Sequence, residues 1–282
     1  MLVSGAYRAR PPAPDEEPCR RIACLDQGTT RYRRDGVIGH VLFDRPQARN
    51  AMTWAMYDEL AAICRQVNEE PDLRAVTFRG AGGKAFIAGT DIAQFSTFRT
   101  GEDGIAYEQQ GEAVLAAIEA IRVPTLAVID GWCVGGGLAI AACCDLRIAT
   151  PAAQFGIPIA RTLGNCLSIA NYTRLINGFG ASRAKRILLL AEMLTAAEAR
   201  DCGFLADVVE ADALDTRTAE LTERLATSAP VTMRVSKQAI ARILKSAAVD
   251  GDDLVRETYA SDDFRLGVEA FLAKRKPDWT GR

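Results

Sequence analysis

Apolar and polar positions along the chain follow two alternating patterns, one typical of strands and one typical of helices. Val37–Phe43 alternates apolar residues with small or polar ones, and the Asp35-Gly36 pair before it predicts a β-hairpin with Arg31–Arg34. Thr53–Val67 carries apolar residues at helical spacing and predicts an amphipathic helix. The same reasoning predicts strands at Ala75–Phe78, Ala153–Phe155 and Leu205–Val209, and a strand over Lys84–Ile92 that turns at Gly89. It predicts helices at Gly104–Ile121, Leu167–Ile176 and Ala181–Leu190.

Strand–strand–helix units repeat up to about residue 210 and indicate an α/β core, which we expect to be a spiral stack of units. The Thr195-x-x-Glu198 spacing predicts a capping box within it. Met1–Cys19 holds four prolines and few large apolar residues, so we expect residues 1–20 to form a disordered or extended arm. The core then covers 21–210, and a helical region covers 211–282. Helices in that region are expected at Ala213–Ser228, Val231–Ala247 and Asp252–Lys274.

The stretch Val123–Ala149 organises the core. Thr125–Ile129 predicts a strand that ends in a tight turn, and Leu138–Cys144 predicts a buried helix because it carries no charge on any face. Gly135-Gly136-Gly137 lies between them and lets the backbone approach another group closely. The first amides of a helix lack internal partners, so this site favours an anion, although tight packing explains the glycines equally well. Neither a phosphate-loop spacing nor a dinucleotide-binding spacing is present.

Composition excludes several classes of function. The net charge of −2 gives no reason to expect a nucleic-acid partner, and no apolar run is long enough to span a membrane. Eight cysteines are present without a CxxC pair, and His40 is the single histidine, so we expect no metal site. We interpret the cysteines as reduced thiols of a cytosolic protein, and we expect His40 to be structural.

Three blocks of sequence carry a resemblance to a known family. They are Asp44-Arg45-Pro46 running into Arg49-Asn50-Ala51, then Leu73–Ile92, and then Val123–Phe155. In this order and spacing the chain resembles the crotonase family, also called the enoyl-CoA hydratase/isomerase superfamily. The resemblance implies a spiral of ββα units whose C-terminal helical region builds homotrimers, often paired into hexamers. It also implies an acyl-CoA substrate and no permanently bound cofactor, since coenzyme A is part of the thioester substrate.

The resemblance assigns roles to particular positions. Two backbone N–H groups, of Thr90 and Gly136, would form an oxyanion hole for the thioester carbonyl, in agreement with the glycine argument. The alternative for Thr90 is a simple helix cap. The resemblance also places coenzyme A along Arg49, Ala88, Thr90, Asp91, Ile92 and Gly136. A surface role in solvent is the alternative for Arg49.

The sequence departs from the family at its acid and base. Hydratases of this family use two glutamates, and the corresponding positions here are Ala139 and Ile159. The family's aromatic-ring dehalogenases also lack the first glutamate, and comparison with them nominates Glu112, Arg161 and Cys166 as residues lining the reaction pocket. The alternatives are a solvated Glu112, a buried structural Cys166, and an Arg161 paired with a carboxylate of a neighbouring chain.

Three functions remain open at this point. The first is an acyl-CoA enzyme that stabilises a thioester enolate or oxyanion with non-standard acid and base residues. The second is an ordinary 2-enoyl-CoA hydratase whose acid and base come from elsewhere, with Glu112 the best candidate. The third is a weakly catalytic scaffold that binds CoA esters. The sequence does not indicate the acyl group.

Overall fold

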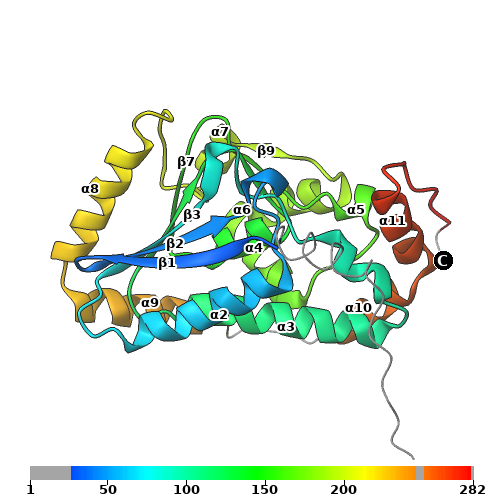
Figure 1. Cartoon of the computed structure of the whole chain (residues 1–282), viewed down its shortest axis with the longest axis horizontal. Helices are drawn as coiled ribbons and strands as arrows, with labels where there is room; N and C mark the ends of the chain where they lie inside the picture. The colour runs from blue at the N-terminus through cyan, green and yellow to red at the C-terminus, as the bar shows by residue number, and fades with distance from the viewer. Residues whose placement is uncertain (1–26, 246–250, 281–282) are drawn as a thin grey trace, which may run out of the picture.

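Two β-sheets form the centre of the molecule, and helices surround them (Figure 1). The computed structural model describes residues 27–245 and 251–280, so the arm predicted over 1–20 lies outside the described residues. The larger sheet has the order β1-β2-β3-β5-β7-β10, and the smaller has the order β4-β6-β8-β9. The strands are β1 (Thr29–Asp35), β2 (Ile38–Asp44), β3 (Ala75–Gly80), β4 (Ala85–Ile87), β5 (Thr125–Ile129), β6 (Trp132–Val134), β7 (Leu146–Ala149), β8 (Gln154–Gly156), β9 (Leu194–Thr195) and β10 (Asp207–Val208).

Each turn of the spiral adds one strand to the larger sheet, one short strand to the smaller sheet, and then a helix. β3 and β4 lead to α3 (Gly101–Glu119), and β5 and β6 lead to α4 (Gly136–Cys143). β7 and β8 lead to the short α5 (Ile159–Thr162) and then α6 (Ile169–Leu189). Successive strands of the larger sheet from β2 to β10 pair in parallel, as helical crossovers require. The predicted spiral of ββα units is confirmed.

The N-terminal hairpin and the first long helix agree with the hydrophobic pattern. β1 and β2 pair antiparallel on either side of the turn at Gly36, whose φ is +56°. α2 (Trp54–Glu69) begins after Thr53, whose side chain accepts a hydrogen bond from the Met56 amide. Met56 and Leu60 are buried on the side of α2 that faces the core, and α2 packs against α3 (Figure 1).

The helix α4 begins at the glycines themselves, two residues before the predicted start at Leu138. Gly135 has a φ of +56°, in the region that favours glycine. A Cβ on Gly137 would lie 2.3 Å from the carbonyl oxygen of Ile87, so the backbones of α4 and β4 approach closely only because glycine stands there. The residues before these glycines form β6, which the sequence pattern did not predict.

Two elements near the site differ in extent from the prediction. β4 covers three residues of the strand expected over 84–92, because Gly89 turns the chain with a φ of +114°. The chain then enters the 3₁₀ helix η3 (Ile92–Thr97). α3 begins three residues earlier than predicted, since Thr100 and Asp103 form a capping box ahead of it.

The C-terminal region is helical, as expected, but two helix boundaries in the second half of the chain differ from the prediction. The helix expected over 252–274 is two helices, because Ser261 is extended and its side chain caps the second one by accepting from the Phe264 amide. The helices expected over 167–176 and 181–190 form one element, α6, interrupted by the non-helical Gly180. The remaining helices are η1 (Pro46–Ala48), η2 (Ala81–Gly83), α7 (Ala196–Asp201), α8 (Leu214–Thr227), α9 (Pro230–Lys245), α10 (Asp252–Ala260) and α11 (Asp262–Leu272).

A second apolar cluster joins the C-terminal helices to the spiral. α10 packs along α3, and α11 packs on η3. The buried members of this cluster are Phe95, Ile105, Leu163, Cys166, Val255, Tyr259, Phe264 and Val268. These contacts place α10 directly behind one wall of the cavity described below. Within residues 27–245 and 251–280, no helix combines the length and the apolar character needed to cross a bilayer.

Candidate active site

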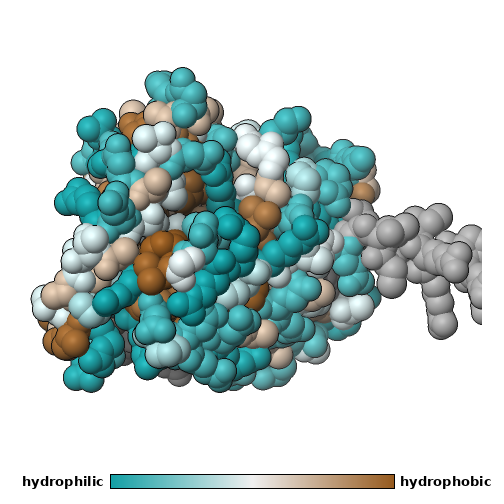
Figure 2. All heavy atoms as spheres, turned by 60° about the vertical axis from the view of Figure 1, so that its left-hand side comes forward, coloured by the Kyte–Doolittle hydropathy of each residue, from teal (hydrophilic) through white to brown (hydrophobic). Residues whose placement is uncertain are grey.

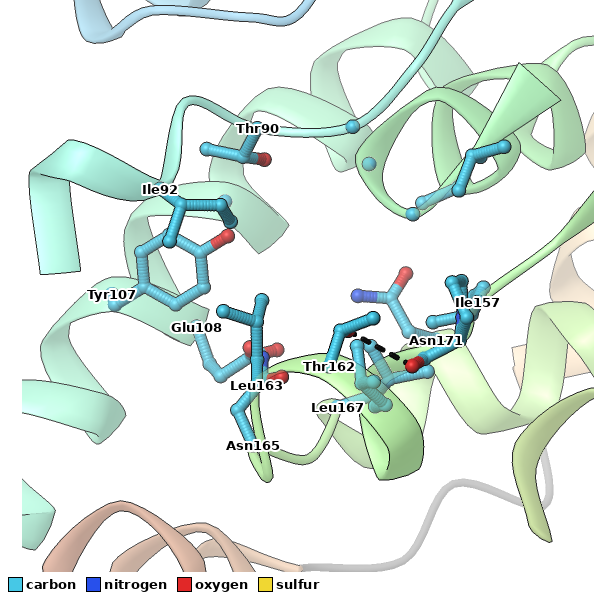
Figure 3. Close-up of a pocket in the computed structure, with 18 of the residues that line it drawn as sticks. Thr90, Ile92, Tyr107, Glu108, Ile157, Thr162, Leu163, Asn165, Leu167 and Asn171 are labelled. Atoms are coloured by element: carbon cyan, nitrogen blue, oxygen red, sulfur yellow. Dashed lines mark hydrogen bonds between the residues drawn. The ribbon is translucent and has the colours of Figure 1, made fainter. Parts of the chain in front are cut away.

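A cavity of about 200 Å³ lies between the β4–η3 turn, α3, the start of α4, and the segment from β8 to α6 (Figure 3). Its wall is mainly apolar and is interrupted by a small number of polar groups, which is usual for a small-molecule site. The polar and ionisable side chains of the wall belong to Tyr57, Thr90, Tyr107, Glu108, Thr162, Asn165, Asn171 and Arg174. The segment between α5 and α6 contributes the lower wall in Figure 3.

Thr90 and Gly136 line this cavity, and local geometry directs both amides away from their own chain neighbours. Met52 donates its amide to Gly89 O at 2.9 Å and accepts from Asp91 N at 2.9 Å, in a parallel bridge opposite Thr90. Alternate peptide groups of an extended segment point in opposite directions, so the Thr90 N–H faces away from Met52. Gly136 is the first residue of α4, and the first amides of a helix have no acceptor within it.

The hydroxyl groups of Tyr57 and Thr90 lie beside Gly136. They form a hydrogen bond of 2.8 Å with each other, and a Cβ on Gly136 would lie 2.5 Å from the Tyr57 hydroxyl. Burial raises the pKa of Tyr57 to about 12, so this hydroxyl is neutral at physiological pH. The space at position 136 therefore admits glycine and nothing larger without a shift of Tyr57.

Glu108 supplies the one carboxyl group among the described residues that line the cavity. It is buried, with Oε2 accepting from the Ser168 amide at 2.7 Å and Oε1 accepting from the Tyr259 hydroxyl at 3.1 Å. Burial raises the pKa of Glu108 to about 7, while these two hydrogen bonds act in the opposite direction. A carboxyl group with this pKa can both accept and donate a proton near neutral pH.

The sequence analysis missed Glu108, although a signal was present. Glu108 shares a helical face with the apolar Ile105 three residues before it and Leu115 seven residues after it. A carboxylate on the buried face of a helix is unusual and therefore informative.

A sequence model of the enoyl-CoA hydratase/isomerase family matches residues 33–282 of this chain. The chain belongs to the enoyl-CoA hydratase/isomerase family. It is 31% identical over 247 residues to a short-chain-enoyl-CoA hydratase of Clostridium acetobutylicum, covering 86% of this chain and 94% of that one. Its structure is similar to that of an enoyl-CoA hydratase/carnithine racemase from Magnetospirillum magneticum, with a TM-score of 0.74 and 32% identity over 92% of this chain and 98% of the other.

A methylmalonyl-CoA decarboxylase shares the fold, with a TM-score of 0.82 at 24% identity over 90% of this chain and 99% of the other. The family and its fold, expected from the three sequence blocks, are thus confirmed. As a member of the enoyl-CoA hydratase/isomerase family, the chain is an acyl-CoA-processing enzyme.

The two positions that the resemblance matched to the hydratase glutamates, Ala139 and Ile159, both line the cavity. Ala139 lies in the first turns of α4, and Ile159 begins α5, and both line the wall with apolar side chains. Neither can transfer a proton. The correspondence itself stays a prediction, but the structure places these side chains where a pocket residue would lie.

The three nominated replacements lie next to the cavity wall rather than in it. Glu112 is one turn beyond Glu108, and its two oxygens accept from Arg174 Nη1 and Nη2, each at 2.6 Å. Arg161 is exposed on α5, while its neighbour Thr162 faces the cavity. Their proposed roles in this enoyl-CoA hydratase/isomerase family member stay predictions.

Cys166, the third nominated residue, is buried in the cluster below α10. Its Sγ lies 3.8 Å from the carbonyl oxygen of Leu254, and burial raises the pKa of the thiol to about 11. A thiol with this pKa is protonated near neutral pH and is a poor nucleophile. Its neighbour Asn165 lines the cavity instead.

The residues that the resemblance assigned to coenzyme A divide into two groups. Ala88 and Ile92 line the cavity together with Thr90. Arg49 is exposed in a left-handed conformation, with its guanidinium carbon 5.8 Å from the ring centre of Trp132. The side chain of Asp91 accepts from the Ala93 amide at the start of η3 and pairs with Arg45 at 2.9 Å.

Two further polar residues act outside the cavity. The Nδ1 atom of His40 lies 2.8 Å from Thr77 Oγ1, across the β2–β3 pair, and burial lowers the pKa of this histidine. Asp145 accepts from the Thr125 amide at 2.7 Å and from Lys237 Nζ of α9 at 2.7 Å. Asp145 therefore anchors the turn between α4 and β7, and it also holds α9 against the core.

Proposed function

We propose that this enzyme moves a proton at the carbon next to the thioester carbonyl of an acyl-CoA, through an enolate held by the amides of Thr90 and Gly136. The observation that carries the proposal is the buried carboxyl group of Glu108 in the same cavity as these two amides. A donor that is fixed where negative charge develops accelerates such reactions by roughly 10²–10³. Two cavity-lining amides that face away from their own chain support this proposed role.

Glu108 would take the place of the two family glutamates. Its carboxylate accepts the α-proton, the C–H electron pair moves onto the thioester oxygen, and the oxyanion is held by the amides. Return of the same proton to a different carbon of a conjugated chain completes a double-bond isomerisation without any other reactant. One carboxyl group suffices for this sequence, so isomerisation fits the cavity better than hydration, in which family members use two glutamates.

The remaining predictions about ligands belong to the same proposal. The adenine and pantetheine of coenzyme A would lie along Arg49, Ala88, Asp91 and Ile92, leading to the carbonyl at Thr90. No permanently bound cofactor is needed for the proton transfer. A cytosolic location is also part of the proposal.

We also propose that the enzyme is a homotrimer or a hexamer assembled through its C-terminal helices. α9 carries exposed apolar side chains on two sides, which include Val231, Val235, Ile240 and Leu244. Figure 2 shows the side of the molecule that carries α8, where apolar groups interrupt a mostly hydrophilic surface. Exposed apolar groups of this kind are common at subunit interfaces.

Exchange of the α-proton with deuterium tests the proposed chemistry. Wild-type enzyme incubated in D₂O with 3-enoyl-CoA and saturated acyl-CoA thioesters should give deuterium at the α-carbon, measured by mass spectrometry. Glu108→Gln should lower the exchange rate at least ~10²-fold, which is the usual contribution of a general base. Glu112→Gln should lower it much less, because Glu112 lies outside the cavity.

The outcomes separate the three functions. Loss of exchange in Glu112→Gln but not in Glu108→Gln would contradict the assignment of Glu108 and support Glu112. Rapid hydration of a 2-enoyl-CoA that depends on either glutamate would support an ordinary hydratase. Tight binding of thioesters with neither exchange nor turnover would support a scaffold and overturn the proposal.

A further inference from the structure

Asn171 presents a hydrogen-bond donor to the cavity in a fixed orientation. It lies in the first turn of α6, where the Ser168 side chain accepts from its backbone amide. Arg174 Nη1 donates to Asn171 Oδ1 at 3.1 Å. Because guanidinium nitrogens only donate, the amide oxygen must be the atom that faces Arg174, and the NH₂ group faces the other way.

The NH₂ group of Asn171 points into the cavity. Figure 3 shows the amide directed into the space between Thr90 above and Thr162 and Leu163 below. Thr162 itself is not a second donor to this space, because its hydroxyl donates to the Pro158 carbonyl oxygen at 2.9 Å. A ligand that fills the cavity therefore meets the Asn171 donor.

The charges around Asn171 decide which kind of acceptor fits. Arg174 is the nearest cation, with a side chain 9% exposed, and it is held by both oxygens of Glu112 and by Glu119 at 2.7 Å. One guanidinium and two carboxylates leave this group with a net charge of −1. Glu108, which lies on α3 together with Glu112 and Glu119, lines the cavity nearby. The surroundings thus disfavour a carboxylate on the acyl group and favour a neutral oxygen.

We propose that the substrate is an acyl-CoA whose acyl chain carries a hydroxyl or oxo oxygen, which accepts a hydrogen bond from Asn171. This inference rests on the proposed function, since it takes the cavity as the acyl site. An unsubstituted acyl chain that covers the NH₂ group of the half-buried Asn171 leaves this group without an acceptor and loses the hydrogen bond. One neutral hydrogen bond corresponds to about a 3- to 10-fold difference in affinity.

Affinities for three thioesters of equal chain length test this. Butyryl-CoA, 3-hydroxybutyryl-CoA and succinyl-CoA are titrated calorimetrically into Glu108→Gln, so that none is consumed. We expect 3-hydroxybutyryl-CoA to bind about 3- to 10-fold more tightly than butyryl-CoA, and succinyl-CoA to bind most weakly. Adding Asn171→Leu should make the affinities for 3-hydroxybutyryl-CoA and butyryl-CoA about equal.

Two further variants keep the test decisive. Asn171→Asp keeps the size and the bond to Arg174 but replaces the donor with an acceptor, so it should also remove the preference. Thr162→Val should retain it, because the Thr162 hydroxyl is already committed to Pro158. The inference would be overturned if Glu108→Gln alone bound 3-hydroxybutyryl-CoA and butyryl-CoA equally tightly. It would also be overturned if the tighter binding of 3-hydroxybutyryl-CoA survived both Asn171 changes. Either result would leave the proposed function standing. Failure of all three thioesters to bind would overturn the proposed function instead.

Discussion

Burial gives one glutamate of α3 a different chemistry from its neighbour one turn away. Glu108 is held by an amide and a hydroxyl in an apolar wall, and its pKa rises to about 7. Glu112 is held by a guanidinium outside the cavity. A carboxyl group that only accepts neutral hydrogen bonds in a buried site can gain a proton at neutral pH.

The raised pKa of Glu108 predicts a pH dependence of stability. The folded protein holds this proton more tightly than the unfolded chain, whose glutamates titrate near 4.3. The stabilising contribution is therefore complete below about pH 4 and is lost as pH rises through 7. Relative to Glu108→Gln, wild type should lose on the order of 2–3 kcal/mol of unfolding free energy between pH 5 and pH 8.

Urea unfolding of both proteins at the two pH values measures this difference. Glu112→Gln serves as the comparison, because its carboxylate faces Arg174. An unfolding free energy difference between wild type and Glu108→Gln that does not change with pH would show that Glu108 is ionised throughout.

The space beside Gly136 leads to a second prediction. In Gly136→Ala the new methyl group would lie 2.5 Å from the Tyr57 hydroxyl and 3.0 Å from Thr90 Oγ1, so the amide at 136 must move. We expect deuterium exchange to fall by roughly 10²–10³. Adding Tyr57→Phe removes the closer oxygen and should restore part of the rate. Wild-type exchange in Gly136→Ala would contradict the role of this amide.

Which residues line the cavity could be predicted from the sequence where the resemblance to the family fixes a stretch of backbone. The resemblance indicated Thr90 and Gly136, and the structure places both in the cavity wall. The choice between Glu108 and Glu112, which share one helical face, could not be made, because it depends on which turn of α3 meets Ser168 and Tyr259 and which meets Arg174. That contact joins residues 60 and 151 positions apart and leaves no local pattern.

At the scale of elements, α3 connects the acid of the cavity with the C-terminal helices. Its start is fixed by a capping box in which the Thr100 hydroxyl accepts from the Asp103 amide and the Asp103 carboxylate accepts from the Thr100 amide. Hydrogen bonds from the Arg99 amide and from the Thr100 amide to this carboxylate lower the pKa of Asp103. α10 then packs along the helix so that Tyr259 reaches Glu108.

Removal of this cap tests how far α3 depends on it. Thr100→Ala should lower the unfolding free energy by about 1 kcal/mol, the usual loss for a threonine cap. The exposed Thr216 inside α8 is a matched control, and Thr216→Ala should be neutral or slightly stabilising, because alanine is the better helix former. Chemical denaturation of both variants measures the difference. Equal effects would show that the cap is dispensable.

Elements could be predicted from the sequence where local signals are strong, as at the Gly36 turn and the Thr195 capping box. The division of the C-terminal helix at Ser261 was missed. The pattern of apolar residues continues across Ser261, and the break arises because α10 follows α3 while α11 turns onto η3. The short strand β6 was missed for a similar reason, since it exists only through its pairing with β4 and β8.

At the scale of the whole molecule, α9 is held to the core yet exposes apolar groups on two sides. Lys237 anchors it by pairing with Asp145 at 2.7 Å. Val231 and Val235 share one face of the helix, while Ile240 and Leu244 share the opposite face. All four side chains are 45–60% exposed in the single chain. A helix that is apolar on opposite sides is typical of a buried position, so a second copy of the chain would complete its surroundings.

Sedimentation measures whether subunits cover this helix. The 30.4 kDa chain should sediment as a trimer or hexamer, and Ile240→Glu combined with Leu244→Glu should shift it toward the monomer, because charges at a buried contact are strongly unfavourable. Glu223→Lys on the exposed side of α8 is a control for a general charge effect. A wild-type monomer at micromolar concentration would contradict the assembly. Retention of deuterium exchange by the monomeric variant would then show that Glu108 and the two amides work within one subunit, as the single-chain cavity implies.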